Sequence, residues 1–394
     1  MKTNIGPHAS LMRERLMKGG LAKGKLAIPA LLLAALALPA FLLARAVAGG
    51  PAESDAQTHV AADPGVDTGA LRAAIDPLFT DDTLGTSRAL VIMRDGAIVA
   101  ERYAPGFGAQ SRLPSGAMAG GVTALLVGFM VSDGRLALDM PAPVPGWNQP
   151  GDPRGKITLR QLLTMSSGID MADDPALPAA ARDGMRMLFT DGAQDIAAYA
   201  QGKPIGHRPG SVFASSPVGT TLLADAVTRM LTDSSDPERR RAAMAQFIDG
   251  RLATPVGLSS LVPEYDAKGT LIGGDFMHMT ARDYAKLGEF LRRGGRANGR
   301  QVLSQRWVAF MTRPSARNRA YGGHLWLNRD GGEGALMPGS APSTLYGLTG
   351  AGGQYMLVSP TQRLVVVRLG LADAEQEKPL HDAMARLIGL FPTG

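Results

Sequence analysis

The distribution of apolar and polar residues places strands near both ends of the chain and helices between them. Two apolar runs, 88–94 and 97–103, flank Asp95-Gly96, a dipeptide typical of a two-residue hairpin turn. Runs rich in β-branched or aromatic side chains predict three further strands in the C-terminal third, at 323–328, 353–359 and 364–370. Strands from both ends around a helical middle predict an α+β fold, with one antiparallel sheet flanked by helices.

Helical spacing dominates the rest of the chain. The apolar run 117–131 predicts a helix, and Thr280, three residues before Asp283, has the spacing of a helix N-cap. Other helices are predicted at 158–165, 191–201, 219–231, 237–253, 280–293 and 376–390. We therefore expect one domain over residues 69–394, with a helical subregion at about 139–271.

The N-terminal segment has a composition of its own. Residues 1–25 carry a net charge of +5, and residues 26–44 are an unbroken run of nineteen uncharged, mostly apolar residues. A helix of that length is about 28 Å long, enough to cross the hydrocarbon core of a bilayer. Because the basic residues precede the run, we expect residues 1–48 to be a signal anchor or a cleavable signal peptide that exports the domain. Small and polar residues predict a linker at 49–68.

Charge and cysteine content exclude several classes of function. Apart from residues 1–25 and Arg45, the chain carries 34 basic and 34 acidic side chains, so its net charge of +6 comes from the N-terminal segment. We therefore expect no nucleic-acid partner. The sequence contains no cysteine, which excludes disulfide bonds, thiolate zinc sites and a cysteine nucleophile.

Five stretches of the sequence carry a family resemblance. They are LVIMRDGAIVAERYAPGF (90–107), VTALLVGFMVSDGRLALDMPAPVPGW (122–147), ITLRQLLTMSSGID (157–170), MTARDYAKLGEFLRRGGRANGRQVL (279–303) and GGQYMLVSPTQRLVVVRLG (352–370). In this order they resemble the β-lactamase-related serine hydrolases: class C β-lactamases, penicillin-binding esterases and, most closely, the 6-aminohexanoate-dimer hydrolase type. The resemblance implies a β-lactamase/transpeptidase-like fold. With an intact site it would imply amide or ester hydrolysis through an acyl-serine, without a cofactor.

The reaction of this family requires a serine at a helix N-terminus and a lysine three residues later. That spacing puts both side chains on one helix face, where the lysine can take the hydroxyl proton. Met118-Ala119 fits the family pattern, and the resemblance then places Ala117 at the serine position and Gly120 at the lysine position. Both groups that make and break the acyl bond are absent from these positions.

Two further motifs are changed in a similar way. VFASS (212–216) resembles the family's Phe-x-Tyr-Ser, so Ser215 stands in place of the tyrosine. GAGGQ (350–354) resembles Gly-His-x-Gly-Gln, so Ala351 stands in place of the histidine. We expect the residues around these positions to line a cleft that the small side chains leave roomier: Gly116, Met118, Gly121, Gly352, Gly353 and Gln354.

No known motif elsewhere in the sequence supplies the missing groups. None of the nine lysines follows a serine or threonine by three positions, and no Gly-x-Ser-x-Gly occurs. The six histidines lack HExxH or His-x-His spacing, so we expect no metal site. Ser115 and Ser215 remain as substitute nucleophiles, although serines before helices more often act as caps.

Three hypotheses on function stay open. In the first, the chain has lost acyl-enzyme catalysis and is a non-catalytic envelope binding or scaffold protein. In the second, it is an active amide or ester hydrolase with a non-standard nucleophile, Ser115 or Ser215. In the third, the active site of an active parent carries deliberate substitutions. The expected partners are a small amide, ester or peptidoglycan-like ligand in the cleft and, through residues 26–44, the inner membrane.

Overall fold

The computed structural model describes residues 58–170 and 182–394. The expected signal segment, 1–48, and the first part of the expected linker lie outside the described residues. Within the described ranges, no helix combines the length and the apolar character that crossing a bilayer requires.

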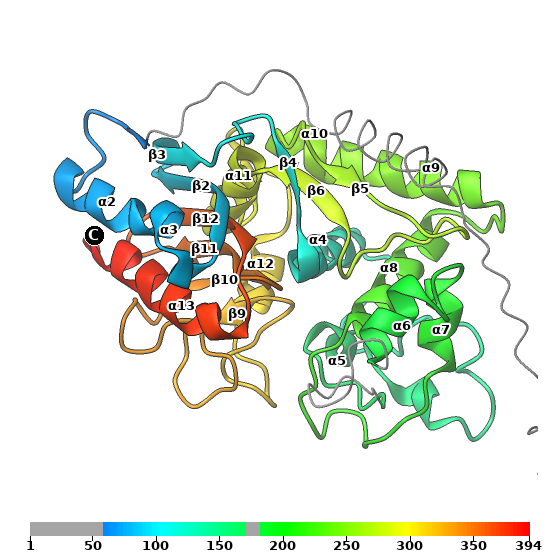
Figure 1. The fold of residues 1–394 in the computed structure, drawn as a ribbon. Helices are drawn as coiled ribbons and strands as arrows, with labels where there is room; N and C mark the ends of the chain where they lie inside the picture. Colours follow the sequence, from blue (N-terminus) through cyan, green and yellow to red (C-terminus); the bar gives the residue numbers. More distant parts are fainter. Residues whose placement is uncertain (1–57, 171–181) are drawn as a thin grey trace, which may run out of the picture. The chain divides into compact units, whose positions relative to one another are not determined.

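Within these ranges, a seven-stranded antiparallel sheet lies on one side of the domain, next to a region of helices (Figure 1). Its strands, in spatial order, are β1 (His59–Val60), β3 (Ala97–Tyr103), β2 (Thr86–Arg94), β12 (Leu364–Leu371), β11 (Gln354–Ser359), β10 (Tyr346–Gly350) and β9 (Trp326–Leu327). The N-terminal strand β2 pairs with the C-terminal strand β12, with Val91 opposite Val367. The predicted α+β fold, with a sheet built from both ends of the chain, is confirmed.

The turn between β2 and β3 is the predicted hairpin turn. Asp95 and Gly96 both have positive φ angles, 52° and 84°. Two residues with positive φ give the turn a twist that matches the twist of the flanking strands. The dipeptide Asp95-Gly96 is therefore sufficient to predict the turn that pairs β2 with β3.

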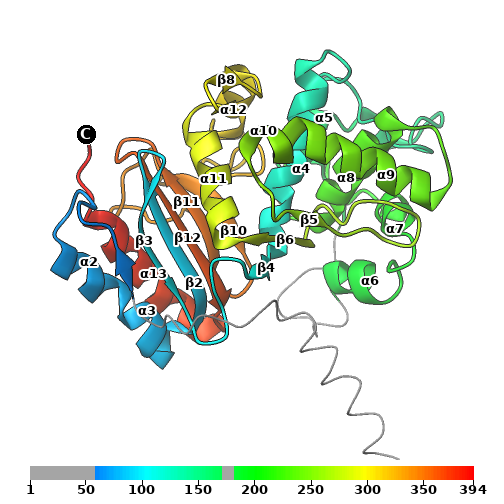
Figure 2. The same ribbon diagram turned by 90° about the horizontal axis from the view of Figure 1, so that it is seen from above.

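Side chains of the sheet alternate between two separate cores. On β2, Leu90 and Ile92 pack with residues of the outer helices, whereas Ala89, Val91 and Met93 belong to the core on the opposite face. This alternation follows from the two-residue period of a strand. One face is covered by α2 (Thr68–Ile75), α3 (Pro77–Thr80) and α13 (Ala374–Gly389), and the other by α11 (Ala281–Arg292) (Figure 2).

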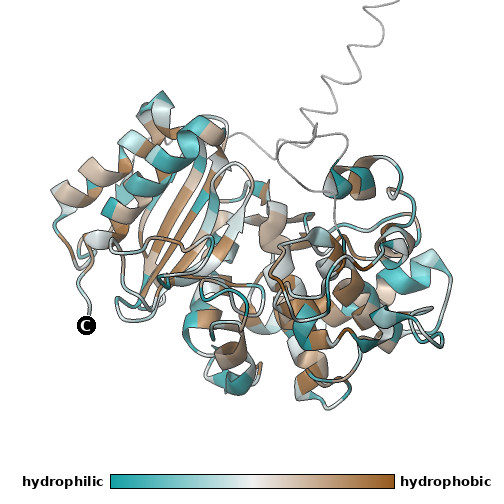
Figure 3. Ribbon diagram, turned by 90° about the horizontal axis from the view of Figure 1, so that it is seen from below, coloured by the Kyte–Doolittle hydropathy of each residue, from teal (hydrophilic) through white to brown (hydrophobic). Residues whose placement is uncertain are grey.

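A helical region adjoins the face that α11 covers, and α4 (Ala119–Ser132) lies inside it. Residues 119–130 of α4 are all buried, as an evenly apolar helix requires. Figure 3 shows the apolar segments gathered in the interior of this region. Its other helices are α5 (Leu159–Leu163), α6 (Asp183–Phe189), α7 (Ile196–Gly202), α8 (Pro217–Leu231), α9 (Pro237–Ile248) and α10 (Thr254–Val256), with a π-helical turn at Asp249–Ala253. These helices lie where the sequence predicts a helical middle.

A small sheet fixes the start of α4. Its strands are β4 (Arg112–Pro114), β6 (Met277–Thr280) and β5 (Val262–Pro263). β4 leads through Ser115 into the 3₁₀ turn η2 (Gly116–Met118), and α4 follows directly. The remaining elements are the hairpin of β7 (Arg296–Ala297) and β8 (Arg300–Gln301), helix α12 (Gln305–Met311) and the 3₁₀ turns η1 (Asp82–Leu84) and η3 (Pro153–Lys156).

The structure differs from the predictions in three places. The predicted strand 323–328 shortens to β9, because the Gly322 amide donates to the Leu325 carbonyl and closes a turn ahead of it. β10 has no counterpart among the predicted strands, since its sequence contains two glycines, which weaken strand propensity. The domain also begins before residue 69, because β1 extends the edge of the sheet beside β3.

Candidate active site

Ser115 attaches the start of the α4 segment to the loop before β6. Its amide donates to the Met277 carbonyl at 2.7 Å, and its hydroxyl donates to the Asp275 carbonyl at 3.1 Å and accepts from the Met277 amide at 3.1 Å. Ser115 is 1% exposed and its side chain makes no bond to the following helical turn. The expectation that Ser115 caps the helix is wrong, because its hydroxyl is used across the loop.

Ala117 and Gly120 line one cleft, one helical turn apart, as the resemblance implies. Ala117 is exposed, whereas Gly120 is buried deeper in the cleft. These two positions present a methyl group and a hydrogen atom. Neither can act as a nucleophile or exchange a proton with one.

The space beside Gly120 is occupied. A β-carbon on residue 120 would lie 3.1 Å from Cδ2 of His324 and 3.7 Å from Cγ2 of Thr220. A β-carbon on Gly121 would lie 2.3 Å from Cδ2 of Leu348, closer than side-chain packing permits. The expectation of a roomier cleft is therefore wrong at its inner end, where other side chains fill the volume.

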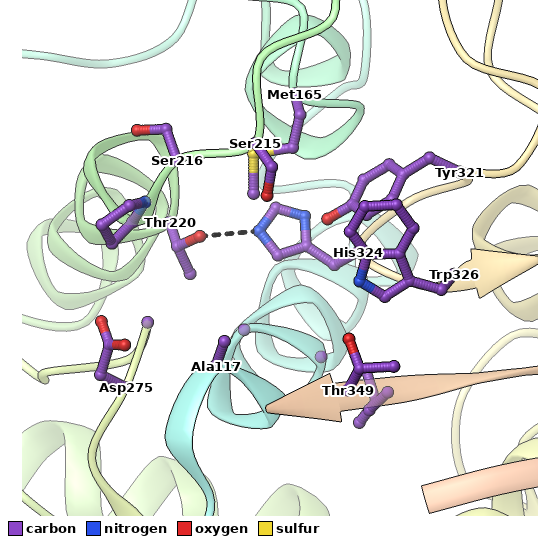
Figure 4. Close-up of a pocket in the computed structure, with 15 residues that line it drawn as sticks. Ala117, Met165, Ser215, Ser216, Thr220, Asp275, Tyr321, His324, Trp326 and Thr349 are labelled. Carbon is purple, nitrogen blue, oxygen red and sulfur yellow. Dashed lines mark hydrogen bonds between the residues drawn. The ribbon is translucent and has the colours of Figure 1, made fainter. Parts of the chain in front are cut away.

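His324 is fixed by hydrogen bonds on both ring nitrogens. Nδ1 lies 2.8 Å from the Leu163 carbonyl oxygen, and Nε2 lies 2.9 Å from the Thr220 hydroxyl (Figure 4). Burial lowers the pKa of His324 to about 4, partly offset by the bond to Leu163, so the ring is neutral at pH 7. Because a carbonyl only accepts hydrogen bonds, Nδ1 carries the proton, and the Thr220 hydroxyl donates to Nε2.

The cleft has a volume of about 130 Å³ and combines apolar groups with polar ones, Asp275 among them. Its lining residues are Ala117, Gly120, Gly121, Met165, Ser215, Ser216, Pro217, Thr220, Gly274, Asp275, Tyr321, His324, Trp326, Leu348 and Thr349 (Figure 4). In the part of the chain that the structure describes, no three histidine, cysteine or acidic side chains are placed to hold a metal ion.

Ser215 lines the cleft from the segment that leads into α8. The N-cap of α8 is Ser216, whose hydroxyl accepts from the Val218 amide at 3.1 Å. Ser216 therefore caps α8, and the expectation of a cap is wrong for Ser215, which is exposed. Among the described residues, no lysine, tyrosine or histidine side chain is hydrogen-bonded to the Ser215 hydroxyl.

The turn between β10 and β11 lies outside the lining of the cleft. Ala351 is exposed, while a β-carbon on Gly353 would lie 2.4 Å from Cδ2 of Leu380 in α13. The buried Arg368 donates to the carbonyls of Gly352 and Gly353 at 3.0 and 2.9 Å and so fixes the turn towards the outer helices.

Most of the predicted cleft-lining residues are therefore misplaced. Gly121 lines the cleft, whereas Met118 is buried in the core beneath the helix. Gly116 is not part of the lining and lies beside the Gln354 amide, which would be 3.3 Å from a β-carbon on residue 116. Gly352, Gly353 and Gln354, at the turn between β10 and β11, are not part of the lining either.

The beta-lactamase family model matches residues 80–390 of the sequence. The chain belongs to the beta-lactamase family. No curated protein matches the sequence. Family membership agrees with the resemblance carried by the five sequence stretches and with the observed fold.

Solved structures of the beta-lactamase fold are similar at low identity. A Bacillus anthracis protein assigned as a 6-aminohexanoate-dimer hydrolase is 20% identical, with a TM-score of 0.63 over 81% of this chain and 83% of that one. A penicillin-binding protein homologue from Caulobacter crescentus is 18% identical, with a TM-score of 0.60 over 85% and 98%. EstCE1, described as a hydrolase with promiscuous acyltransferase activity, is 16% identical, with a TM-score of 0.61 over 82% and 99%. At such identities the similarity shows the fold alone.

Sequence reasoning did not identify several residues of this beta-lactamase-family cleft. Thr220, Tyr321, His324 and Trp326 all line it, and the last three come from one short turn, YGGHLW (321–326). The signal that could have found them is a histidine and two aromatic residues around paired glycines, which predict a turn rather than a strand. The aromatic content of the segment outweighed that signal.

Proposed function

We propose that this member of the beta-lactamase family has lost Ser/Lys/Tyr acyl-enzyme catalysis and acts as a non-catalytic binding protein. One observation carries the proposal: a methyl group stands at the helix start, at Ala117, and the imidazole of His324 occupies the space beside Gly120. A lysine at position 120 would meet that ring. The cleft has thus been filled with another side chain at the position where the family's reaction needs an amine.

The expected loss of rate is large. Removing the nucleophilic serine of a triad hydrolase lowers kcat about 10⁶-fold and leaves roughly 10³–10⁴ over water from the oxyanion site and binding. By analogy, a site that lacks the serine, the lysine and the tyrosine together cannot sustain acyl-enzyme turnover. Binding of a ligand in the cleft requires none of these groups.

The hydroxyl groups near the cleft do not replace the missing nucleophile. Ser115 is buried behind it, and Ser215 has no base among its described hydrogen-bond partners. Thr220 does donate to a histidine, an arrangement that resembles a nucleophile paired with a base. Thr220 is only 2% exposed, however, and burial opposes the positive charge that His324 would acquire on taking the proton.

Covalent labelling tests the proposal directly. The full chain is treated with a fluorophosphonate or with a β-lactam, and its intact mass is measured against that of a hydrolase with an intact Ser-x-x-Lys motif. We expect an adduct on the active hydrolase and none on this chain. A stoichiometric adduct mapped to Ser115, Ser215 or Thr220 would overturn the proposal and favour the rival hypothesis, an amide or ester hydrolase with a non-standard nucleophile.

The place of action follows from the N-terminal segment. We propose that residues 26–44 anchor the chain in the inner membrane, unless the signal is cleaved, and that the domain binds a small amide, ester or peptidoglycan-like ligand in the envelope. Protease added to intact spheroplasts should then digest the domain, and membrane washes should leave the chain in the pellet. Protection from the protease would refute export, and release by washing would refute the anchor.

A further inference from the structure

One tight turn supplies two aromatic side chains, Tyr321 and Trp326, which form an aromatic wall of the cleft. Tyr321 and Trp326 pair across a bridge, and the Gly322 amide donates to the Leu325 carbonyl at 2.9 Å. Between them His324 adopts a φ of 60°, which its amide and Nδ1 both stabilise by bonding to one carbonyl, that of Leu163. The same turn therefore presents two aromatic rings and a neutral imidazole to the cleft (Figure 4).

The aromatic rings of the wall are fixed by their neighbours. The ring centroids of Tyr321 and Trp326 are 4.8 Å apart with an angle of 80° between the planes, and Phe213 packs on both, at 5.1 and 6.2 Å. On its other side the indole of Trp326 packs against Gly334, where a β-carbon would lie 2.3 Å from Cζ3. Edge-to-face packing of this kind is favourable, so the wall is preorganised.

Trp326 is the ring of this wall that a ligand can reach. Tyr321 is 4% exposed, whereas Trp326 is half-buried and lines the cleft together with Met165. An aromatic ring of a ligand could lie against both the indole and the thioether, two contacts that are favourable for π systems.

The described lining contains no positive charge to pair with an anion. It includes no lysine or arginine, and its ionisable groups are Asp275, Tyr321 and His324. Burial raises the pKa of Tyr321 and lowers that of His324, so both are neutral at pH 7. A ligand carboxylate would leave water without a counter-charge, which is unfavourable in a partly buried site.

The volume of the cleft is close to that of a cavity that holds one aromatic ring. A cavity of about 150 Å³ accommodates benzene, and the cleft here measures about 130 Å³. Polar groups of a ligand would meet the hydroxyls of Ser215 and Thr349 at the lining.

We propose that the cleft receives the aromatic ring of a neutral ligand, such as an aryl-bearing amide, and discriminates against ligands that carry a carboxylate. This inference rests on the proposed function, a binding cleft without covalent chemistry. It adds the chemical class of the ligand and the residues that select it. Trp326 contacts the ring, and a described lining without a lysine or arginine sets the discrimination against a carboxylate.

Intrinsic fluorescence can test the selectivity because the chain contains three tryptophans and only Trp326 lines the cleft. Trp147 and Trp307 are 1% and 3% exposed. The full chain is titrated with N-acetylphenylalaninamide, with the carboxylate N-acetylphenylalanine and with the ringless N-acetylalaninamide. We expect saturable quenching by the first compound and at least about tenfold weaker binding of the other two, since one lacks the ring and the other brings an unpaired charge.

Substitutions test the contact with Trp326 and the effect of charge on ligand preference separately. Trp326→Leu should abolish binding measured calorimetrically, while Phe189→Leu, an exposed aromatic residue outside the cleft, should leave it unchanged. Ser215→Lys places a cation at an exposed position of the lining and should shift the preference towards the carboxylate, while Ser215→Gln, of similar length, should not. The two Ser215 substitutions lie at an exposed position and leave the packed side of the cleft intact.

Failure of the proposed ligand class can be distinguished from failure of the proposed function. Equal binding of the amide and the carboxylate, binding retained by Trp326→Leu, or no binding of the amide would each overturn the ligand class. The intact mass of the same samples after fluorophosphonate treatment reports on the proposed function alone, since a covalent adduct would refute it whichever ligand binds.

Discussion

Cδ2 of His324 lies 3.1 Å from the point that a β-carbon on residue 120 would occupy. Gly120 and His324 therefore depend on each other: the glycine leaves room for the ring, and the ring fills the space that the glycine leaves. Glycine inside a helix is less stable than alanine by about 1 kcal/mol, so helix propensity alone does not explain residue 120. Packing against His324 does.

The first prediction tests this dependence with a double-mutant cycle. Gly120→Ala should destabilise the wild-type chain, because crowding of about 1–3 kcal/mol outweighs the gain in helix propensity. In a His324→Ala background the same substitution should stabilise by about 1 kcal/mol, since the crowding is relieved. Urea denaturation gives both values. Gly250→Ala, at a residue with no other atom near its β-carbon position, should have the same effect in both backgrounds.

The second prediction concerns pH. Burial lowers the pKa of folded His324 from 6.5 to about 4, so between these values the unfolded chain binds a proton that the folded chain does not. The free energy of unfolding should therefore fall as the pH decreases from 6.5 to 4, with a contribution from His324 of up to about 1.4 kcal/mol per pH unit. Above pH 6.5 this contribution vanishes.

Replacement of His324 isolates that contribution. His324→Gln should show a shallower decrease in the free energy of unfolding over the same pH range, while the titrating carboxylates act alike in both proteins. Parallel pH profiles of the two proteins would show that the ring titrates normally and is not enclosed.

The third prediction concerns Arg368, which is fully buried and has no acidic partner among its hydrogen bonds. Its guanidinium donates to the Ser87 hydroxyl and to the carbonyls of Gly352, Gly353 and Leu371. Burial lowers its pKa to about 10, so it stays charged at pH 7. Arg368→Met should destabilise the fold by about 2–4 kcal/mol, because several buried acceptors lose their donor.

An exposed arginine provides the control for Arg368. Arg363 is half-exposed and contacts Asp95 on the sheet hairpin. Arg363→Met should change the free energy of unfolding by less than about 0.5 kcal/mol, as expected for a surface pair. Similar losses for the two variants in urea denaturation would contradict a structural role of the Arg368 hydrogen bonds in fixing the turn.

The sequence predicts the fold well where one continuous stretch of residues carries the signal. The Asp95-Gly96 turn, the N-cap at Thr280 and the apolar run of α4 each formed as expected. β10 was not predicted, because Gly347 and Gly350 hide a strand that exists through pairing with β11 and β9 on either side. Pairing between distant segments carries no signature in a single stretch of sequence.

The candidate site was predictable along the helix and not across the cleft. The motif spacing singles out Ala117 and Gly120, and both residues line the cleft. His324 lies beside Gly120 although it is about two hundred positions away in the sequence. Small residues were therefore interpreted as empty space, whereas a side chain from a distant turn fills it. The space left beside a buried residue depends on all the side chains that surround it.

The fourth prediction restores the family's groups. Ala117→Ser, Gly120→Lys and Ser215→Tyr rebuild the Ser-x-x-Lys pair and the tyrosine that the resemblance implies, but a lysine at 120 meets the imidazole of His324. The triple variant should therefore remain inactive and lose stability. Adding His324→Gly removes the ring, and glycine suits the positive φ at that position.

The quadruple variant should hydrolyse a simple aryl ester at least about 100-fold faster than its counterpart that keeps Ala117, a small part of the roughly 10⁶-fold that a nucleophile contributes. Fluorophosphonate should label it at residue 117 and leave the counterpart unlabelled. If the triple variant were as active as the quadruple one, His324 would not occupy the position of the lysine. The silent site would then be explained by the loss of the serine, the lysine and the tyrosine, without a contribution from His324. Activity that depends on all four changes would instead mark Gly120 and His324 as one packed unit, whose replacement reopens the cleft to acyl transfer.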